Sequence, residues 1–468
     1  MFLTFFGLEA IPSTREKWAT TRGAANPWQR GGISPCEVRV IFAFPKHSGN
    51  VKLRIGAALA AFAASMMGQS TLTLEEAVRE AIANNQDLAA ERLNIPVAQA
   101  REITARLRPN PVLTVSGQTL NILGANYSPS TPLGPNQLNV HTDIPFERGH
   151  KREERMAVAK EETKLMELGV REIMRQVIAA VQSAFVDVQQ ARQNLSLAQE
   201  NLKSVESIVA INESRLKAGD LAQVEFDRAR VAALQYRTAV QQAQLQLDQA
   251  KIQLQQAMGR RQKSTGMEVS SELRQDVVSS TEEELVQLAL ARRPDFLMDQ
   301  QAQVRSRADL RLQLANGKAD YSIGTEFTRQ SAWGISGNSA GVYFSIPLRV
   351  FNRNQGEIAR AEREIALAGA RKAALETSIQ TEVDKAYRQY TVSRDLLANV
   401  QTGMLGKARS VRDTTEYSYK RGEASLLEYL DAQRAFNEAM QTFNDARAGY
   451  ARSLYWIDTV SGATVSGL

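Results

Sequence analysis

The chain has 468 residues and a formal net charge of +6, with 57 Lys and Arg residues against 51 Asp and Glu residues. Residues 1–54 hold eight of the basic and three of the acidic residues, so the rest of the chain is nearly balanced at 49 basic and 48 acidic. This balance argues against a nucleic-acid-binding protein, which needs a basic face. The single cysteine, Cys36, lies in this N-terminal segment, and a remainder without cysteine suits an oxidising compartment.

The N-terminal segment predicts an exported protein. Lys52 and Arg54 precede an apolar run from Ile55 to Met67, which is too short to span a bilayer as a helix. We interpret residues 51–69 as a signal peptide, with a buried core helix as the alternative. Residues 1–50 do not fit a leader, and we expect them to be a mis-annotated N-terminal extension ahead of a true start at Val51.

The remaining sequence contains an internal duplication. LKAGDLAQVEFDRAR (Leu216–Arg230) recurs as YKRGEASLLEYLDAQ (Tyr419–Gln433), and EEAVREAIANNQDL (75–88) recurs as EELVQLALARRPDF (283–296). A long internal period indicates one structural unit that occurs twice. Each copy predicts a helix, two strands, a very long helix, a hairpin turn and a final helix. We expect a first repeat at 72–260, an equatorial connector at 261–280, a second repeat at 281–462 and a C-terminal tail at 463–468.

The predicted helices have matching lengths in the two repeats. Apolar or small residues recur every three or four positions, which is the pattern of a coiled coil. The long helix of the first repeat has about 71 residues, or roughly 105 Å, and two shorter helices stacked end to end would equal it. A cytosolic coiled coil would fit this pattern as well. The predicted helices are Thr73–Leu107, Glu147–Lys217, Ala222–Met258, Thr281–Leu314, Gly356–Lys420 and Ala424–Asp458.

Four alternating stretches of about nine to eleven residues predict strands, at the length of a tilted membrane strand. A half-exposed sheet of a soluble protein would alternate in the same way, but the signal peptide and the long helices favour a membrane. Four strands cannot close a barrel, and an open edge cannot face lipid, so we expect a cyclic oligomer around a polar channel. The strands are Val112–Leu120, Leu138–Phe146, Asp320–Gln330 and Gly341–Leu348.

These features carry a family resemblance. Over residues 72–462 the chain resembles the TolC family of outer-membrane efflux proteins. The segments SIPLRVFNRNQGEIARAEREI and LLEYLDAQRAFNEA are similar to its heavy-metal branch, of the cobalt-zinc-cadmium or copper-silver type. The resemblance implies a membrane α+β fold, in which a long α-helical coiled-coil barrel is continued by a β-barrel shared between three protomers with four strands each.

The same resemblance implies where the protein acts and with which partners. It implies a homotrimer in the outer membrane of a Gram-negative bacterium, surrounded by outer-membrane lipid, with a tunnel in the periplasm. A periplasmic adaptor (membrane fusion) protein and an inner-membrane RND-type pump are the implied partners. No cofactor and no nucleic acid are expected.

The resemblance also suggests a periplasmic gate at the hairpin tips. By register from the turn glycine, Glu428 and Asp431 match the acids that form rings in the family, and Glu225 and Tyr419 match further tip positions. Glu428 and Asp431 are three residues apart and share a helix face, which an ordinary solvated face would also explain. The family has an arginine at the position of Ala424, so Lys420 or Arg421 would have to replace it in a latch between the hairpins.

The hairpin turns are predicted at Gly219 and Gly422, where a helix needs a left-handed C-terminal residue. Leu221 and Leu426 lie beside these turns. They would either contact the adaptor or pack the hairpins together.

The sequence predicts a conduit and no enzyme. It contains no nucleophile motif, no phosphate-binding glycine loop and no dinucleotide signature. His47, His141 and His150 lack the spacing of metal ligands, so we expect no metal site. The predicted function is the outer-membrane exit duct of a tripartite efflux system. The alternatives are the duct of a type I protein secretion system and a non-channel periplasmic coiled-coil structural protein.

Overall fold

A computed structural model describes residues 71–118, 136–260, 267–332 and 335–466. The chain divides into residues 1–68 and 69–468, and the fold below is that of the second unit. The predicted extension and signal peptide therefore lie outside the described residues. In chain order, the helices and strands are α2 (Leu74–Asn84), α3 (Gln86–Arg92), α4 (Asn94–Arg106), β1 (Val112–Gln118), β2 (Asn136–Phe146), α5 (Lys151–Ala218), α6 (Gln223–Ala257), α7 (Glu282–Arg292), α8 (Pro294–Asn316), β3 (Tyr321–Ala332), β4 (Ile335–Ser345), α9 (Gln355–Asn399), the π-helix η1 (Val400–Met404), α10 (Leu405–Arg421), α11 (Leu426–Val460) and α12 (Ala463–Ser466).

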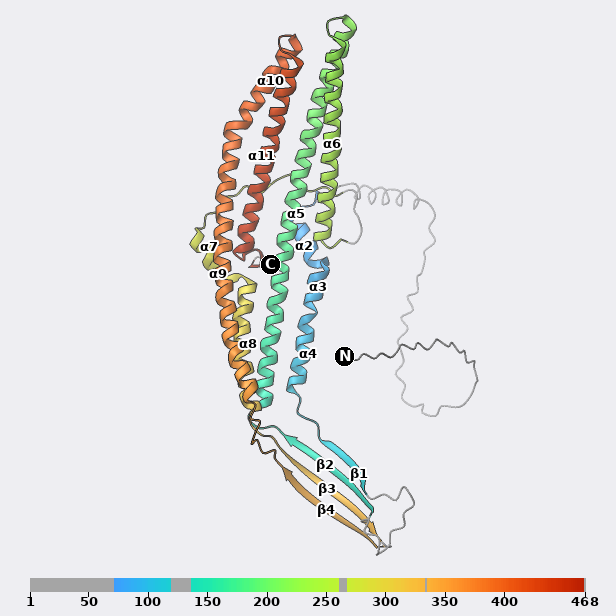
Figure 1. The fold of residues 1–468 in the computed structure, drawn as a ribbon, viewed down its shortest axis with the longest axis vertical. Coiled ribbons are helices and arrows are strands. Elements are labelled where there is room, and N and C mark those ends of the chain that lie inside the picture. The colour runs from blue at the N-terminus through green and yellow to red at the C-terminus, as the bar shows by residue number, and fades with distance from the viewer. Residues whose placement is uncertain (1–70, 119–135, 261–266, 333–334, 467–468) are drawn as a thin grey trace, which may run out of the picture. The chain divides into compact units, whose positions relative to one another are not determined.

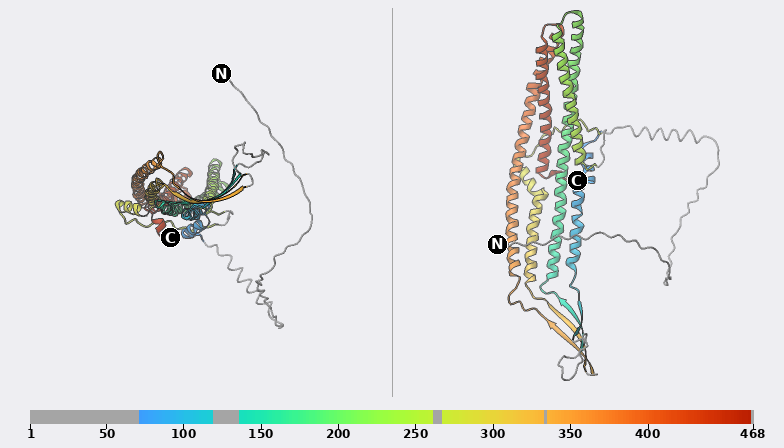
Figure 2. Two further views of the ribbon diagram at one scale, coloured as in Figure 1. Left: turned by 90° about the horizontal axis from the view of Figure 1, so that it is seen from below. Right: turned by 45° about the vertical axis from the view of Figure 1, so that its right-hand side comes forward.

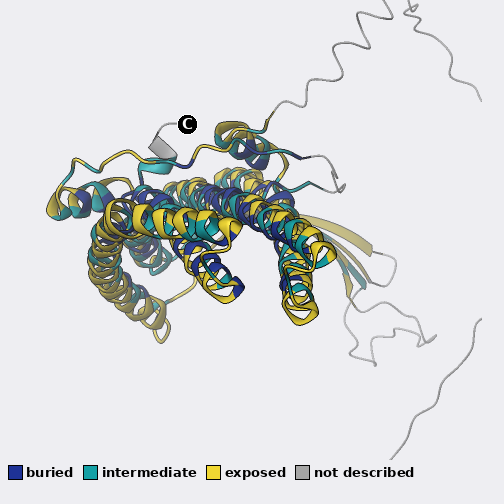
Figure 3. Ribbon diagram, turned by 90° about the horizontal axis from the view of Figure 1, so that it is seen from above, coloured by how far each residue is buried: buried dark blue, intermediate teal, exposed yellow. Residues whose placement is uncertain are grey.

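The helices lie side by side, with the strands at one end and the two hairpin turns at the other (Figures 1 and 2). Seen along their length, they form a curved layer (Figure 3). Near the turns the layer contains α6, α5, α11 and α10, and near the strands it contains α4, α5, α8 and α9. None of the described helices is both long and apolar enough to cross a bilayer.

Short helices stacked end to end accompany each long helix, as their lengths predict. Helix α5 has 68 residues, about 100 Å, and contacts α6 along one half and α2, α3 and α4 along the other. In the second repeat, α9 likewise contacts α11, α7 and α8. Both repeats open with the same capping box, in which Thr73 pairs with Glu76 and Thr281 pairs with Glu284.

The first helix of each repeat is broken, so the predictions of continuous helices at Thr73–Leu107 and Thr281–Leu314 were wrong. In the first repeat, Asn85 is extended and its side chain caps the next helix by accepting from the Leu88 N–H. In the second repeat the break falls at Arg293, which is extended because the residue before a proline avoids the helical region. Pro294 then begins α8.

The long helix of the second repeat is also interrupted, whereas Gly356–Lys420 was predicted as one continuous helix. A five-residue π-helical turn at Val400–Met404 separates α9 from α10. The turn contains Gly403, a weak helix former, and Thr402, whose hydroxyl donates to the carbonyl of Ala398 at 2.8 Å. No such turn occurs among the residues of α5.

Two glycines allow the short helices to stack closely. Gly259 follows α6 with φ +72°, and a Cβ atom there would lie 2.7 Å from the carbonyl oxygen of Asn84. Gly462 follows α11 with φ +73°, and its Cβ would lie 3.1 Å from the backbone of Arg292. These positions correspond in the two repeats. Where α6 meets α2, Arg260 forms a bidentate ion pair with Glu80, with N–O distances of 2.5 and 2.7 Å.

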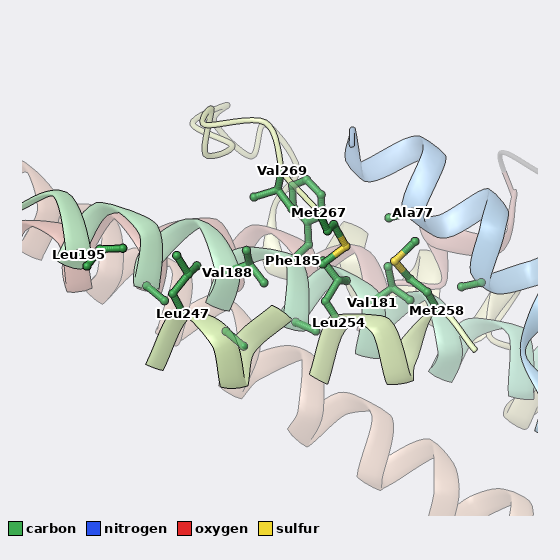
Figure 4. Close-up of a cluster of buried hydrophobic side chains, with 14 of the residues drawn as sticks. Ala77, Val181, Phe185, Val188, Leu195, Leu247, Leu254, Met258, Met267 and Val269 are labelled. Atoms are coloured by element: carbon green, nitrogen blue, oxygen red, sulfur yellow. The ribbon is translucent and has the colours of Figure 1, made fainter. Parts of the chain in front are cut away.

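Residues 267–280 run across the helices and join the two repeats. The segment begins beside the first repeat, where the N–H of Leu72 donates to the carbonyl of Glu268 at 2.8 Å. Gln189 of α5 donates to the carbonyls of Ser270 and Glu272, and Tyr450 of α11 donates to the carbonyl of Asp276. The largest apolar core lies beside this segment, where Phe185, Leu254, Met258 and Met267 meet (Figure 4).

The described strands form an antiparallel sheet in the order β1-β2-β3-β4. Each repeat contributes one hairpin, and β2 pairs with β3 across the repeats, with Phe146 opposite Tyr321. Strand β4 starts and ends earlier than the predicted Gly341–Leu348. It ends at Ser345 because Pro347 has no N–H to continue the ladder. The predicted end of the first strand, Leu120, lies outside the described residues.

Replacing Gly259 by Ala tests the close contact between the end of α6 and the end of α2. We expect the free energy of unfolding to fall by about 2 kcal/mol, because a Cβ at positive φ is strained and would collide with Asn84. Thermal or denaturant unfolding followed by circular dichroism measures this change. Gly406→Ala is the matched control, since a Cβ there meets nothing within 4 Å, and it should be neutral or slightly stabilising. Equal effects of the two variants would contradict the explanation.

Candidate functional site: the two-faced sheet and the hairpin tips

One face of the sheet carries most of its exposed apolar side chains. The register brings residues of this face together across the strands, as where Ile144 pairs with Ile323, and Ile323 with Phe344. These side chains are exposed in the single chain, between 41% and 62% for the three named. A large exposed apolar surface marks contact with lipid or protein. Further exposed members of this face are Leu113, Val115, Leu138, Phe146, Phe327 and Val342.

The opposite face of the sheet is polar. His141, Asp143 and Glu326 lie on it, and the ring of Tyr343 stacks on His141 with 4.4 Å between centroids. Tyr343 crosses above Gly324, where a Cβ would lie 2.0 Å from its hydroxyl oxygen, so only glycine permits this arrangement. The predicted alternation of apolar and polar faces is therefore present in the sheet.

The outer strands of this sheet have unpaired edges. Among the described residues, β1 pairs only with β2, and β4 pairs only with β3. The outward backbone groups of both strands thus have no ladder partner within the described chain. In lipid such groups must be paired, so a sheet of this kind needs further strands.

The predicted turn glycines end the long helices at the hairpin tips. Gly219 has φ +84° and Gly422 has φ +83°, the left-handed conformation that ends a helix. The backbone N–H groups of Asp220 and Glu423 bond back into the last helical turn at 2.9 Å each. Both turns lie at the end of the helices away from the sheet (Figure 1).

Beside the turns, a cluster of polar and aromatic side chains fastens the two hairpins together. Arg215 donates to the carbonyl of Lys420 at 2.8 Å, and Tyr419 donates from its hydroxyl to Asn212 at 2.7 Å. Tyr419 stacks on Tyr429, with 5.6 Å between ring centroids. Burial raises the pKa of Tyr419 and raises that of Tyr429 to about 12, so both hydroxyls remain protonated donors near neutral pH.

Arg215 joins the first hairpin to the second within this chain, through the carbonyl of Lys420. The two basic residues considered for the latch contact their own helix: Lys420 pairs with Glu416 at 2.6 Å, and Arg421 lies over the ring of Tyr417. Ala424 is half-buried against the tyrosine cluster. Sequence reasoning missed Arg215 because a basic residue in the last turn of a helix is explained by the helix alone.

Polar pairs continue this contact along α5 and α11. Asn201 accepts from Gln433 at 2.8 Å and donates to Asn437 at 2.7 Å. Further along, Asn444 donates to Asn194 at 3.0 Å. Buried amides accept few alternative partners, so these pairs fix the register of the first hairpin against the second.

The predicted gate residues occupy different environments. Glu428 closes a capping box at the start of α11, accepting from the N–H of Ser425 at 2.7 Å. Asp431 is 77% exposed and lies 3.6 Å from Arg434. Glu225 holds the corresponding position in α6, but the helix is preceded there by Ala222, which has no capping side chain. Tyr419 is buried among the hairpin contacts and lies away from solvent.

The leucines beside the turns also differ. Leu426 is 6% exposed and packs with Tyr419 and Tyr429, while Leu221 is half-buried. Two neighbours of these leucines, Val224 and Leu427, are largely exposed. They line a groove of about 720 Å³ between α6 and α11, which we call the tip groove.

Metal ligation is not indicated in the part of the chain that the structure describes. No group of three or more His, Cys, Asp or Glu side chains is arranged there to hold an ion. His141 is stacked on Tyr343, and His150 precedes α5 with an exposed ring near Glu153.

Long helices in a curved layer, an antiparallel sheet with opposite faces and unpaired edges, and an internal duplication define a class of membrane channel. The family model described as "Outer membrane efflux protein" matches residues 77–260 and 285–463, one match in each repeat. The chain belongs to this family. It is an outer-membrane channel of the kind that serves as the exit duct of tripartite efflux systems.

Solved structures share the fold. A membrane protein from Pseudomonas aeruginosa is 20% identical with a TM-score of 0.68, covering 83% of this chain and 90% of its own. CusC is 19% identical with a TM-score of 0.69, covering 84% and 92%. The CmeC outer membrane channel of Campylobacter jejuni is 16% identical with a TM-score of 0.68, covering 84% and 86%. A search of curated protein sequences found no significant match.

The capping box of Glu428 predicts a pH dependence at the second tip. Hydrogen bonds from the N–H and hydroxyl of Ser425 hold the pKa of Glu428 below its usual value. A carboxylate with a lowered pKa stabilises the folded state above its unfolded pKa, and this contribution is lost as pH falls through the folded pKa. We expect the first turn of α11 to lose protection from hydrogen exchange below about pH 4, relative to the Glu428→Gln variant.

Hydrogen-exchange mass spectrometry of the peptide around residues 422–430 makes this measurement, with values corrected for intrinsic exchange. Ser425→Ala should weaken protection at every pH, since it removes the other half of the box. Identical profiles for the native chain and Glu428→Gln would show that the carboxylate does not hold the cap.

Proposed function

We propose that three copies of this chain assemble into a ring that carries substrates across the periplasm and the outer membrane. The observation that carries the proposal is the sheet with unpaired edges at β1 and β4. Three sheets joined edge to edge would give twelve strands, above the roughly eight of the smallest membrane barrels. In that ring the apolar face contacts lipid and the face with His141 and Glu326 lines the channel.

Exposed apolar side chains on the outermost helices of the layer support the same assembly. Val231, Leu245 and Ile252 of α6 are each at least half exposed, and so is Val392 of α9. These helices lie at opposite margins of the layer, so the margin of one protomer would pack on that of the next. The ring thereby continues the curved layer seen along the helices (Figure 3).

The tip groove supports docking of a periplasmic adaptor. Its wall combines exposed apolar residues with charges of both signs, including Glu225 and Arg228, as helix-in-groove contacts do. We assign the adaptor contact to Val224 and Leu427, with Leu221 and Leu426 packing behind them. An inner-membrane pump of the RND type would then supply the energy, because no energy-converting motif occurs in the sequence.

The carboxylates near the tips support a gate in the assembled ring. Three copies of Asp431 and Glu428 would place acidic groups around one opening, where they attract cations and repel one another. The side chain of Asp431 is more exposed, whereas Glu428 also accepts a hydrogen bond in the N-terminal cap of α11. Tyr419 and Arg215 would hold the two hairpins of one chain together in the closed state. Glu225 would lie on the first hairpin, next to the acidic residues of the second.

For cargo we propose metal cations of the cobalt-zinc-cadmium or copper-silver group. The support is the resemblance of the second repeat to that branch and the similarity of fold to CusC at 19% identity. The leader assignment at residues 51–69 fits export of such a channel, and N-terminal sequencing of the membrane-bound protein tests it.

Planar-bilayer recording tests the gate. The double variant Glu428→Gln and Asp431→Asn removes both charges while keeping a capping side chain at the start of α11. We expect higher single-channel conductance and weaker block by divalent cations, because the ring charges that hold cations are gone. Glu438→Gln, an exposed acid further along α11, is the matched control and should leave the record unchanged.

Gene deletion tests the cargo. Loss of the chain should lower tolerance to zinc, cobalt, cadmium, copper or silver salts at least as strongly as tolerance to antibiotics. Complementation by the native gene restores growth if the duct is responsible. Antibiotic sensitivity with unchanged metal tolerance would overturn the metal assignment and leave the channel function in place.

A further inference from the structure

Three aromatic side chains lie together on the apolar face, at the end of the sheet nearest the helices. The rings of Phe146 and Tyr321 stack with 5.3 Å between centroids, and the ring of Tyr321 lies 5.6 Å from that of Phe344. We call these three residues, from β2, β3 and β4, the aromatic row. Aromatic residues at the end of an apolar band are typical of the boundary between lipid and water. The aromatic row therefore marks the level of the lipid headgroups on the periplasmic side.

Two acids at this level point to the polar face of the sheet. Glu147 and Asp320 are next to members of the aromatic row in the chain, so the alternation of the strands turns both away from it. Asp320 pairs with Lys151 at 2.6 Å, and Glu147 pairs with Arg155, in the first turns of α5. These two acids are therefore neutralised on the polar side and do not face the aromatic row.

Two basic side chains on the side of the aromatic row have no acidic partner among the described residues. Arg148 is exposed and lies two positions beyond Phe146, on the alternation of the apolar face. Lys318 is also exposed. It lies on the same face of α8 as the half-exposed Leu314, because Gly317 between them keeps a helical conformation. Both cations thus point to the open side of the junction between the sheet and the helices.

The two cations lie beside each other where α5 and α8 meet the sheet (Figure 1). A Cβ on Gly149 would lie 2.5 Å from the Cδ atom of Lys318, so the lysine stem passes the residue that follows Arg148. Glu153, an exposed acid in the first turn of α5, lies 3.9 Å from His150, so the pair keeps an excess of positive charge. Strands β2 and β3 are the central strands, so the pair lies away from the edges at which protomers would meet.

We propose that Arg148 and Lys318 bind the phosphate of an anionic phospholipid, whose acyl chains lie on the aromatic row and the apolar face. Guanidinium and ammonium groups both donate to phosphate oxygens, and basic residues at a membrane surface favour anionic lipids. Lipid is the occupant because the pair directly continues the apolar face, which a soluble anion would leave uncovered. The placement of that face in lipid rests on the proposed function.

Native mass spectrometry of the detergent-solubilised full chain tests the proposal. The probes are phosphatidylglycerol and phosphatidylcholine with identical acyl chains. Both carry a phosphate, but the choline group adds a positive charge that the two cations repel. We expect phosphatidylglycerol to bind about tenfold more tightly at low salt, with a smaller difference at high salt. Equal binding of the two lipids would overturn the proposal. Displacement of the lipid by millimolar inorganic phosphate would indicate a simple anion site and would overturn it as well.

Charge-matched variants locate the binding. The double variant Arg148→Gln and Lys318→Gln should bind both lipids equally. The matched control is Lys160→Gln with Arg307→Gln, which removes the same charge from exposed positions of α5 and α8 more than two turns further from the sheet. The control should keep the preference for phosphatidylglycerol. An unchanged preference in the first variant, or an equal loss in both, would contradict the assignment to the junction.

Bilayer recording of the same protein separates this inference from the proposed function. A conducting channel that binds the two lipids equally would overturn the lipid site alone. A preference for phosphatidylglycerol that depends on Arg148 and Lys318, in a chain that forms no channel, would sustain the lipid site and overturn the ring.

Discussion

Unpaired backbone at the two edges of the sheet is the constraint on which the rest of this structure depends. Each repeat supplies one hairpin, and the strands of the two repeats pair at β2 and β3, which leaves β1 and β4 open. Water can satisfy such edges, but lipid cannot. A chain with an apolar sheet face therefore becomes a membrane protein only by closing its edges against further strands, and the helices above the sheet must follow the same symmetry.

Within one chain, the duplication solves a packing problem. A single long helix beside the sheet would have no partner of equal length, and the stacked short helices provide one. Gly259 and Gly462 let the stacked ends meet, and segment 267–280 ties the repeats together across α5 and α11. The buried amide pairs of Asn201 and Asn444 then hold the hairpins in one register.

Much of this fold could be predicted because its helices and strands show regular spacing of apolar residues. Alternation identified the strands, three-four spacing identified the helices, and Gly219 and Gly422 marked the turns. The interruptions could not be found in this way. The break at Asn85 depends on one capping side chain, and the turn at Val400–Met404 depends on local backbone hydrogen bonding. The spacing of apolar residues over many turns does not detect either feature. Tyr419 was predicted at the tip, but its partners Arg215 and Asn212 come from the other repeat, 204 to 207 residues away.

The π-helical turn in the second repeat gives the two halves of the molecule unequal stiffness. Helix α5 runs without interruption for 68 residues from the sheet to the hairpin turn at Gly219, so a displacement of this turn is transmitted along the helix to the strands. In the second repeat the corresponding helix is interrupted at Val400–Met404, between the strands and the turn at Gly422. Bending is therefore concentrated at Val400–Met404, so the second hairpin moves more readily than the first against the rest of the layer.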